Sequence, residues 1–269
     1  MAAPEQDRLI TSLTNDTVKA VRALHMRKER EATGRFLAEG LKFIGEALDQ
    51  GRAPKLLLVG EEARPHPLLE RAKAETRAAG GEVVVVTRAI LEKISRRDNP
   101  QTVLGVFDQV YTPLSAVVPE SAPCWVALEQ VRDPGNLGTI VRTADAAGCG
   151  GVILVGDCVD PYSVEAVRAT MGSVFAVAIA RASQAEFLAW RQGWPGSVIG
   201  TRLDAVHGYR DAAIQRPALI VMGNEQAGLT DELAAACDVN VKIPMRGRAD
   251  SLNLAIATGI MVYAVTDED

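Results

Sequence analysis

The second half of the sequence alternates short apolar runs with segments of helical period, and this alternation constrains the fold more than any other feature. The apolar runs 125–128, 151–155 and 218–222 have the length of strands rather than helices. Segments such as 137–147, with apolar residues at helical spacing, separate them. Strands joined by helices favour a mostly parallel sheet with helices on both faces. Ligands of such sheets bind beyond the carboxyl ends of the strands.

The same criteria applied to the whole chain predict an α/β protein of two domains, since 269 residues exceed what one ordinary core supports. We expect a small α/β domain over 1–110, a linker over 111–122 around a proline-rich stretch, and a larger α/β domain over 123–269. The predicted helices span 17–30, 41–49, 67–79, 89–94, 137–147, 164–171, 184–190, 231–236 and 252–265. The predicted strands span 55–59, 83–86, 103–107, 125–128, 151–155, 175–179, 197–201, 218–222 and 239–243.

Composition excludes several classes of protein. With 48% apolar and 23% charged residues the chain is that of a soluble globular protein. Its apolar runs are far shorter than the roughly 20 residues of a membrane span, so no membrane partner is expected. The N-terminal MAAPEQDRLI lacks the basic and then apolar order of a secretion signal, which favours a cytoplasmic location. Four cysteines without C-x-x-C spacing and three scattered histidines predict no metal site.

The charge of the chain is unevenly distributed. The net charge of −5 argues against electrostatic coating of a nucleic acid by the whole surface. Residues 1–110, however, hold 18 Lys and Arg against 16 Asp and Glu, whereas residues 111–269 hold 11 against 18. The predicted helix 17–30 carries a basic face, which is either a solvated surface or a phosphate-binding one. If a polyanion binds, the N-terminal part is the expected platform.

Motifs for nucleotide kinases, dinucleotide oxidoreductases and serine hydrolases are absent, and three polar clusters remain. The first is N-x-G-x-x-x-R, from Asn136 to Arg142. The second is G-N-E at 223–225, directly after an apolar strand. The third combines I-P-M at 243–245 with S-L-N at 251–253. All three lie at the end of a predicted strand or the start of a predicted helix in the larger domain.

Each cluster also has a purely structural explanation. Asn136 and Ser251 could serve as helix N-caps. Gly223 could serve a tight turn, and Arg142 could be a surface residue paired with Asp145. The individual clusters therefore do not distinguish a site from well-formed turns and helix ends.

In this order and spacing, the clusters resemble the SpoU (TrmH-like) branch of the SPOUT class of RNA methyltransferases, which methylate the ribose 2′-hydroxyl. Upstream, 35–40 and 99–101 resemble the substrate-binding domain that precedes the catalytic domain in many ribosomal RNA members. The resemblance implies a C-terminal α/β trefoil-knot domain behind a small α/β substrate-binding domain. It implies S-adenosylmethionine as cofactor and RNA as substrate, with ribosomal RNA favoured over transfer RNA because of the added domain.

The resemblance also assigns roles to particular residues. Arg142 would hold a substrate phosphate or the developing alkoxide, because a guanidinium keeps its proton. Glu225 would orient Arg142 or a nearby amide. The expected catalytic residues are Asn136, Arg142, Glu225, Ser251 and Asn253; the expected cofactor-binding residues are Thr201, Leu203, Met222, Gly223, Ile243, Met245 and Leu252. The expected RNA-binding residues are Lys19, Arg22, Arg27, Arg35 and Arg168, although a surface salt bridge explains Arg168 equally well.

Two further expectations concern assembly and alternatives. Apolar Leu254, Ile256, Ile260 and Val262 exceed what one face of the last helix needs, and together with the resemblance they predict a homodimer through the C-terminal domain. The alternatives to a ribosomal RNA methyltransferase are a transfer RNA 2′-O-methyltransferase and a catalytically inactive RNA-binding homologue. A dinucleotide oxidoreductase would need a glycine-rich turn after its first strand, which is not found there.

Overall fold

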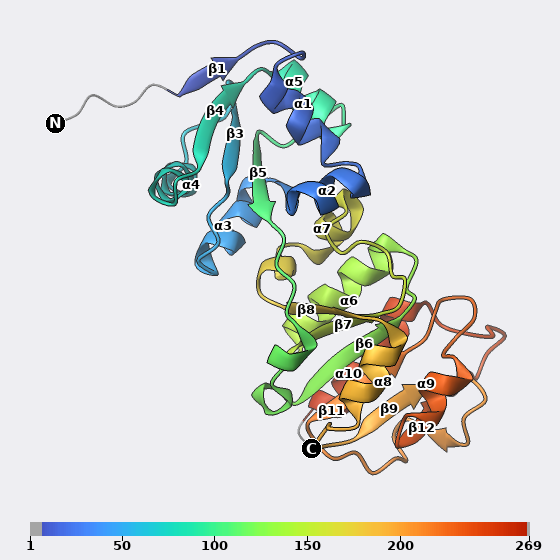
Figure 1. Cartoon of the computed structure of the whole chain (residues 1–269). Helices are drawn as coiled ribbons and strands as arrows, with labels where there is room; N and C mark the ends of the chain where they lie inside the picture. The colour runs from blue at the N-terminus through green and yellow to red at the C-terminus, as the bar shows by residue number, and fades with distance from the viewer. Residues whose placement is uncertain (1–6, 268–269) are drawn as a thin grey trace. The chain divides into compact units, whose positions relative to one another are not determined.

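A computed structural model describes residues 7–267; residues 1–6 and 268–269, at the outer ends of the two expected domains, lie outside the described residues. Most of the N-terminal stretch 1–10, which the sequence analysis judged to lack a secretion signal, therefore lies outside the described residues. The chain divides into two compact units (Figure 1). The first comprises Met1–Gln109 and Tyr162–Phe175, and the second comprises Val110–Pro161 and Ala176–Asp269.

This division differs from the contiguous domains predicted, because residues 162–175 belong to the first unit. Aromatic packing explains the difference: the ring centroids of Phe36 and Tyr162 lie 4.7 Å apart, and those of Phe107 and Phe175 lie 4.8 Å apart. Tyr162 and Phe175 are buried there. None of the helices described between residues 7 and 267 has the length and apolarity needed to cross a membrane.

The first unit is built on a mixed five-stranded sheet. The strand order is β1 (Arg8–Ile10), β4 (Glu82–Val86), β3 (Leu56–Gly60), β5 (Val103–Asp108), β2 (Arg35–Glu39). β1 and β3 run parallel to β4, whereas β5 is antiparallel to β3 and β2. Its helices are α1 (Asp16–Ala23), α2 (Arg27–Thr33), α3 (Leu41–Asp49), α4 (Pro67–Ala78), α5 (Arg88–Ser95) and α7 (Val164–Thr170). The sequence analysis did not predict β1 and β2.

Helices α1 and α5 cover one face of this sheet, and α3 and α4 pack together against the same strands (Figure 1). The predicted helix over 17–30 was wrong: it is two helices. Met26, with φ −91° and ψ 129°, is extended and separates α1 from α2. The buried guanidinium of Arg30 donates to the Leu24 carbonyl oxygen at 2.8 Å and stabilises this turn. Apolar residues continue at helical spacing through the break, so periodicity alone could not detect it.

The second unit is built on a seven-stranded sheet in which every neighbouring pair runs parallel, as predicted. The order is β10 (His207–Gly208), β12 (Val239–Lys242), β9 (Val198–Thr201), β11 (Ala218–Met222), β6 (Cys124–Glu129), β7 (Gly151–Val155), β8 (Ala178–Ala182). Its helices are α6 (Pro134–Ala146), α8 (Gln184–Arg191), α9 (Asp231–Ala235) and α10 (Leu254–Thr266). Short 3-10 turns are η1 (Leu114–Ala116) and η2 (Pro119–Ser121) here, and η3 (Ser173–Phe175) in the first unit.

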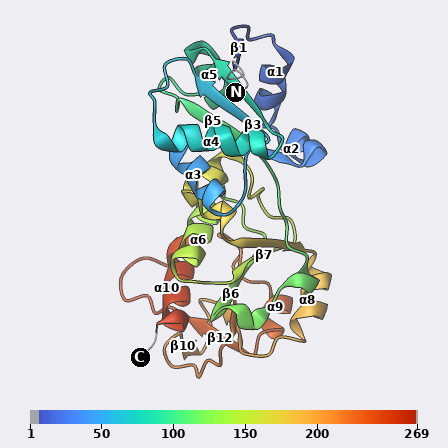
Figure 2. The same cartoon turned by 90° about the vertical axis from the view of Figure 1, so that its left-hand side faces the viewer.

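Side-chain alternation divides the core of this unit between two faces. Trp125 and Ala127 of β6 pack with Phe187 of α8 and Leu233 of α9. Helices α6 and α10 pack side by side and also contact β6, β7 and β11 (Figure 2). Helices therefore cover both faces, as predicted. The predicted strand 175–179 was displaced, because Phe175 belongs to η3 and the strand begins at Ala178.

Candidate active site

A carboxylate joins the second polar cluster to the first. Oε1 of Glu225 accepts hydrogen bonds from the backbone N–H of Asp133 at 3.1 Å and from Asn136 Nδ2 at 3.2 Å. Oε2 accepts from the backbone N–H of Arg132 at 3.1 Å. The loop after β11 is therefore tied to the start of α6, although about 90 residues separate them in the sequence.

The Asn136 amide extends this network to the third cluster. Its Oδ1 accepts from Asn253 Nδ2 at 2.8 Å. Asn253 Oδ1 accepts in turn from the backbone N–H of Ala255 at 2.9 Å and caps α10. The N-caps are thus Asp133 for α6 and Asn253 for α10, so the simple capping explanation does not hold for Asn136 or Ser251. The three clusters form one hydrogen-bonded chain from Glu225 through Asn136 to Asn253.

These hydrogen bonds also set the ionisation of Glu225. Partial burial raises the pKa of the carboxyl group, but hydrogen bonds from backbone N–H groups and from Asn136 outweigh burial and leave the pKa below its usual value. Glu225 is therefore ionised at neutral pH. A carboxylate held this way is a weak proton acceptor and a strong structural anchor.

The G-N-E loop itself is a tight turn that requires glycine at its first position. Asn224 and Gly228 exchange two backbone hydrogen bonds of 3.0 and 2.9 Å. Asn224 Nδ2 donates to the Gln130 carbonyl oxygen at 2.7 Å. A Cβ atom on Gly223 would lie 2.0 Å from the backbone nitrogen of Leu229, so no side chain fits there. The loop is held on both sides, and sequence reasoning missed Asn224 as its organising residue.

A cavity of about 180 Å³ lies at the carboxyl ends of β9, β11 and β12. The seven residues predicted to bind the cofactor all line it: Thr201, Leu203, Met222, Gly223, Ile243, Met245 and Leu252. Glu225 and Ser251 line it as well. The walls combine aliphatic and thioether side chains with backbone at the strand ends, which suits the flat apolar adenine and ribose of S-adenosylmethionine. Thr201 would contribute backbone only, because its hydroxyl donates to the Val221 carbonyl oxygen at 3.1 Å.

A second, more polar cavity of about 600 Å³ shares Asn224, Glu225 and Gln226 with the first. Asn136 and Asn253 line it. The arrangement places an apolar slot beside a polar hollow, with Glu225 bordering both. This is the geometry needed to present an activated group from one ligand to a polar acceptor on another.

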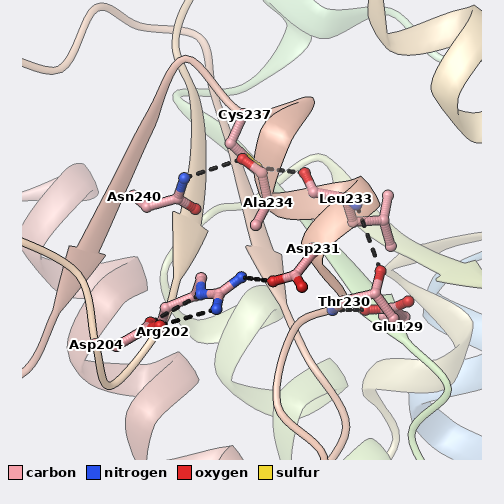
Figure 3. A network of polar contacts seen from close by, with 9 residues as sticks. All are labelled: Glu129, Arg202, Asp204, Thr230, Asp231, Leu233, Ala234, Cys237 and Asn240. Atoms are coloured by element: carbon pink, nitrogen blue, oxygen red, sulfur yellow. Dashed lines mark hydrogen bonds and ion pairs between the residues drawn. The ribbon is translucent and has the colours of Figure 1, made fainter.

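Further polar contacts stabilise the loops around these cavities (Figure 3). Glu129, only 2% exposed, accepts a hydrogen bond from the backbone N–H of Thr230 at 2.9 Å, and Thr230 caps α9. Arg202 bridges Asp204 and Asp231 at 2.8 and 2.6 Å, which ties the loop after β9 to α9. The sequence analysis missed both Glu129 and Arg202. An acidic residue at the end of an apolar strand was the available signal for Glu129.

Arg142 is separate from this network. It is exposed on α6 and lines neither cavity. Within residues 7–267 its side chain makes no hydrogen bond or ion pair, so its expected structural partner Asp145 does not hold it. Glu225 orients the Asn136 amide rather than Arg142; of the two roles predicted for Glu225, the structure shows the second.

The five basic residues predicted to contact RNA do not form one cluster. Arg168 donates to Glu39 at 2.7 Å and to the Ser95 carbonyl oxygen at 3.1 Å, and the Glu39 side chain is only 3% exposed. The salt-bridge interpretation of Arg168 is therefore the one observed, because this pair anchors α7 to β2. Ion pairs engage three others: Lys19 with Asp16, Arg27 with Glu31, and Arg35 with Asp108. The Arg22 side chain has no hydrogen-bond or ion-pair partner in the described part of the chain.

The structure offers no arrangement for a metal ion among the residues it describes. No group of three or more His, Cys, Asp or Glu side chains between 7 and 267 is suitably placed. The four cysteines are free thiols, and Cys124, Cys149 and Cys158 are buried.

Comparison with known proteins identifies the class of this chain. The SpoU rRNA methylase family matches residues 123–263, and the MRM3-like substrate binding domain matches residues 15–105. The chain is 31% identical to the 23S rRNA (guanosine(2553)-2′-O)-methyltransferase RlmP of Bacillus subtilis, over 94% of this chain and 97% of that protein. The chain therefore belongs to the SpoU rRNA methylase family.

Solved structures agree with this assignment. The AdoMet-bound rRNA methyltransferase of Sinorhizobium meliloti superposes with a TM-score of 0.91 at 49% identity, covering 97% of this chain and 98% of that one. The SpoU methyltransferase AviRb of Streptomyces viridochromogenes superposes with a TM-score of 0.83 at 28% identity, covering 94% and 96%. Both the two-unit architecture and the fold of each unit are thus shared along nearly the whole chain.

Proposed function

We propose that this chain transfers a methyl group from S-adenosylmethionine to a ribose 2′-hydroxyl of 23S ribosomal RNA. One observation carries the proposal: residues of the second and third motifs line one cavity at the carboxyl edge of a parallel sheet, and a hydrogen-bonded chain links them to Asn136 of the first motif. The relatives support the substrate class, because RlmP is named as a 23S rRNA 2′-O-methyltransferase and the S. meliloti protein as an AdoMet-bound rRNA methyltransferase.

The loops after β9, β11 and β12 would hold the cofactor. Their aliphatic and thioether side chains exclude water from the adenosine, and the strand-end backbone provides polar partners. When bound, S-adenosylmethionine supplies an electrophilic methyl group on a positively charged sulfur. The contribution of the protein is then chiefly to position the hydroxyl oxygen in line with that methyl.

The residues around the polar hollow would position the RNA. Glu225 fixes the plane of the Asn136 amide, and Asn253 braces it from the other side. Ser251 lines the cofactor cavity and would hold the ribose or the methionine end of the cofactor. Because the Glu225 carboxylate is occupied by three donors and its pKa is lowered, it anchors this arrangement and does not take the hydroxyl proton.

Arg142 would act on the RNA from outside the cofactor cavity. Its guanidinium has no partner among the described residues and is available for a phosphate or a developing alkoxide. A guanidinium group at this position would supply positive charge rather than act as a base.

Assembly and domain roles complete the proposal. The first unit would serve as the RNA platform, and a homodimer would form through α10. Ile256 is 55% exposed and Tyr263 45% exposed on α10, whereas Leu254 and Val262 are buried within the chain. The trefoil knot implied by the family resemblance stays a prediction, and a transfer RNA substrate and an inactive RNA-binding role stay alternatives for experiment.

The test is methyl transfer from S-adenosylmethionine labelled in its methyl group. Separate reactions contain 23S rRNA transcript, isolated ribosomal subunits and total transfer RNA. We expect label in a ribosomal substrate. Label only in transfer RNA would overturn the assigned substrate, and no label in any RNA, from protein that binds the cofactor, would favour the inactive homologue.

A further inference from the structure

We propose that a groove between α1 and α5 is a binding site for RNA phosphates, which places the RNA platform of the proposed function on one face of the first unit. The α1–α5 groove is a cavity of about 810 Å³. Five cationic side chains line it: Lys19 and Arg22 from α1, and Lys93, Arg96 and Arg97 from α5 and the segment that follows it. The sequence analysis predicted the first two of these residues and missed the other three.

The positive charge of the groove is largely uncompensated. The side chains of Arg22, Lys93, Arg96 and Arg97 make no hydrogen bond or ion pair with any residue between 7 and 267. Four such cations around one hollow repel one another, and a bound polyanion relieves that repulsion. The charges of these side chains therefore favour an anionic ligand, whatever the shape of the groove.

The carboxylates near the groove do not cancel this charge. Glu92 and Asp98 also line it. Glu92 accepts a 2.9 Å hydrogen bond from Arg88, so its charge is already paired. The carboxylate that pairs with Lys19 belongs to Asp16, whose side chain is 98% exposed and weakly held. Five cations therefore stand against the carboxylate of Asp98 and the already paired carboxylate of Glu92, which leaves the groove with a net positive charge.

The backbone at Arg96 supports a functional reason for one of these cations. Arg96 ends α5 in the left-handed conformation, with φ +56°, where glycine is the usual residue. A side chain in this conformation costs stability, and such residues are concentrated at functional sites. Here the position carries an unpaired guanidinium at the edge of the groove.

The single histidine of the groove adds no charge at neutral pH. His25 Nε2 donates to the Ile94 carbonyl oxygen at 2.6 Å. Burial lowers the pKa of His25, the Ile94 hydrogen bond opposes this effect, and the nearby charge of Arg96 adds to the lowering. The attraction for an anion therefore comes from the lysine and arginine side chains of the groove.

The composition of the groove selects the part of the RNA that is bound. Apart from His25, no aromatic side chain lines it, so stacking of unpaired bases is not supported. Lysine and arginine around an open hollow are suited to phosphate contacts, which fix position without reading sequence. We therefore assign the groove to the RNA backbone, with the target nucleotide recognised elsewhere.

The test compares two full-length variants with matched charge loss. Arg22→Gln/Lys93→Gln/Arg97→Gln removes three cations from the groove. The control Arg64→Gln/Arg71→Gln/Lys73→Gln removes three cations in and just before α4, none of which lines the groove. Filter binding of 23S rRNA transcript is measured across a KCl series, and cofactor affinity is measured by calorimetry.

The groove variant is expected to lower the slope of log affinity against log salt by about 2 to 3 and to weaken binding more than about tenfold at moderate salt. The control should change this slope by less than about one, which corresponds to about one phosphate contact. Cofactor affinity should stay the same in both. Equal losses in the two variants, or wild-type binding by the groove variant, would overturn the proposal.

Arg96→Gly separates charge from folding. Glycine relieves the left-handed strain, so the melting temperature should be unchanged or raised while RNA binding weakens. Unchanged RNA binding in this variant would count against the groove. Since the inference rests on the proposed function, methylation by the wild-type chain is assayed in parallel. If the wild-type chain binds RNA but methylates none, and the groove variant loses that binding, the groove is supported and the activity is refuted.

Discussion

Glu225→Gln tests whether the carboxylate that links the three motifs supports the site. The change keeps the size of the side chain but replaces an acceptor of three hydrogen bonds with an amide that offers one oxygen. With the amide oxygen in the place of Oε1, the Arg132 N–H loses its partner, and the hydrogen bonds from Asp133 and Asn136 no longer end on a charged oxygen. A hydrogen bond to a charged group contributes about 1.5 kcal/mol at the low end and a neutral one about 1 kcal/mol, so the loss of one bond and the weakening of two should lower the unfolding free energy by about 2–3 kcal/mol.

This loss corresponds to a fall in melting temperature of about 4–10 °C, followed by calorimetry or circular dichroism. Because the Asn136 amide also loses its fixed orientation, methyl transfer should fall by roughly a hundredfold. Glu120→Gln is the control, since Glu120 is exposed on η2 and lines neither cavity. A Glu225→Gln variant with the melting temperature and activity of the control would refute the anchoring role.

Three further results are expected. Arg142→Ala should abolish methyl transfer while calorimetry shows nearly unchanged cofactor affinity; loss of cofactor affinity in a folded variant would move Arg142 into the cofactor site. The stability that Glu225 contributes should be fully present above the ordinary pKa of 4.5 and be lost as the pH falls through the lowered pKa of the folded state. The difference in unfolding free energy between wild type and Glu225→Gln should therefore shrink only below about pH 4.5. Ile256→Asp, at a 55% exposed position of α10, should convert the dimer into a monomer, as measured by sedimentation. Wild-type protein that sediments as a monomer at micromolar concentration would contradict the dimer.

Sequence patterns predicted the elements whose own residues determine them. The strands 151–155 and 218–222 were located to the residue, because continuous apolar runs bounded by glycine or proline have few other solutions. The motif loops follow strand ends, and parallel strands bring those ends to one edge of the sheet. This explains why residues from Thr201 to Leu252 surround one cavity.

The remaining features depend on contacts between distant segments, which periodicity does not contain. Residues 162–175 belong to the first unit because their aromatic side chains pack against Phe36 and Phe107. The role of Glu129 depends on Thr230, about 100 residues away. The α1–α5 groove combines cations about 70 residues apart in the sequence, so the predicted helix 17–30 alone showed only the two cations that it contributes. The ion-pair partner of Arg168 could not be located from the sequence, because Glu39 lies on a strand that was not predicted.

The most direct test of the proposed activity is to locate the methyl group that the purified protein adds to RNA. Ribosomal subunits or 23S rRNA transcript are incubated with the protein and S-adenosylmethionine carrying a deuterated methyl group, and the RNA is digested for mass spectrometry. The account predicts the label on a ribose 2′-oxygen, where it blocks alkaline cleavage at the adjoining phosphate. Label on a nucleobase, in dinucleotide steps that alkali still cleaves, would contradict it.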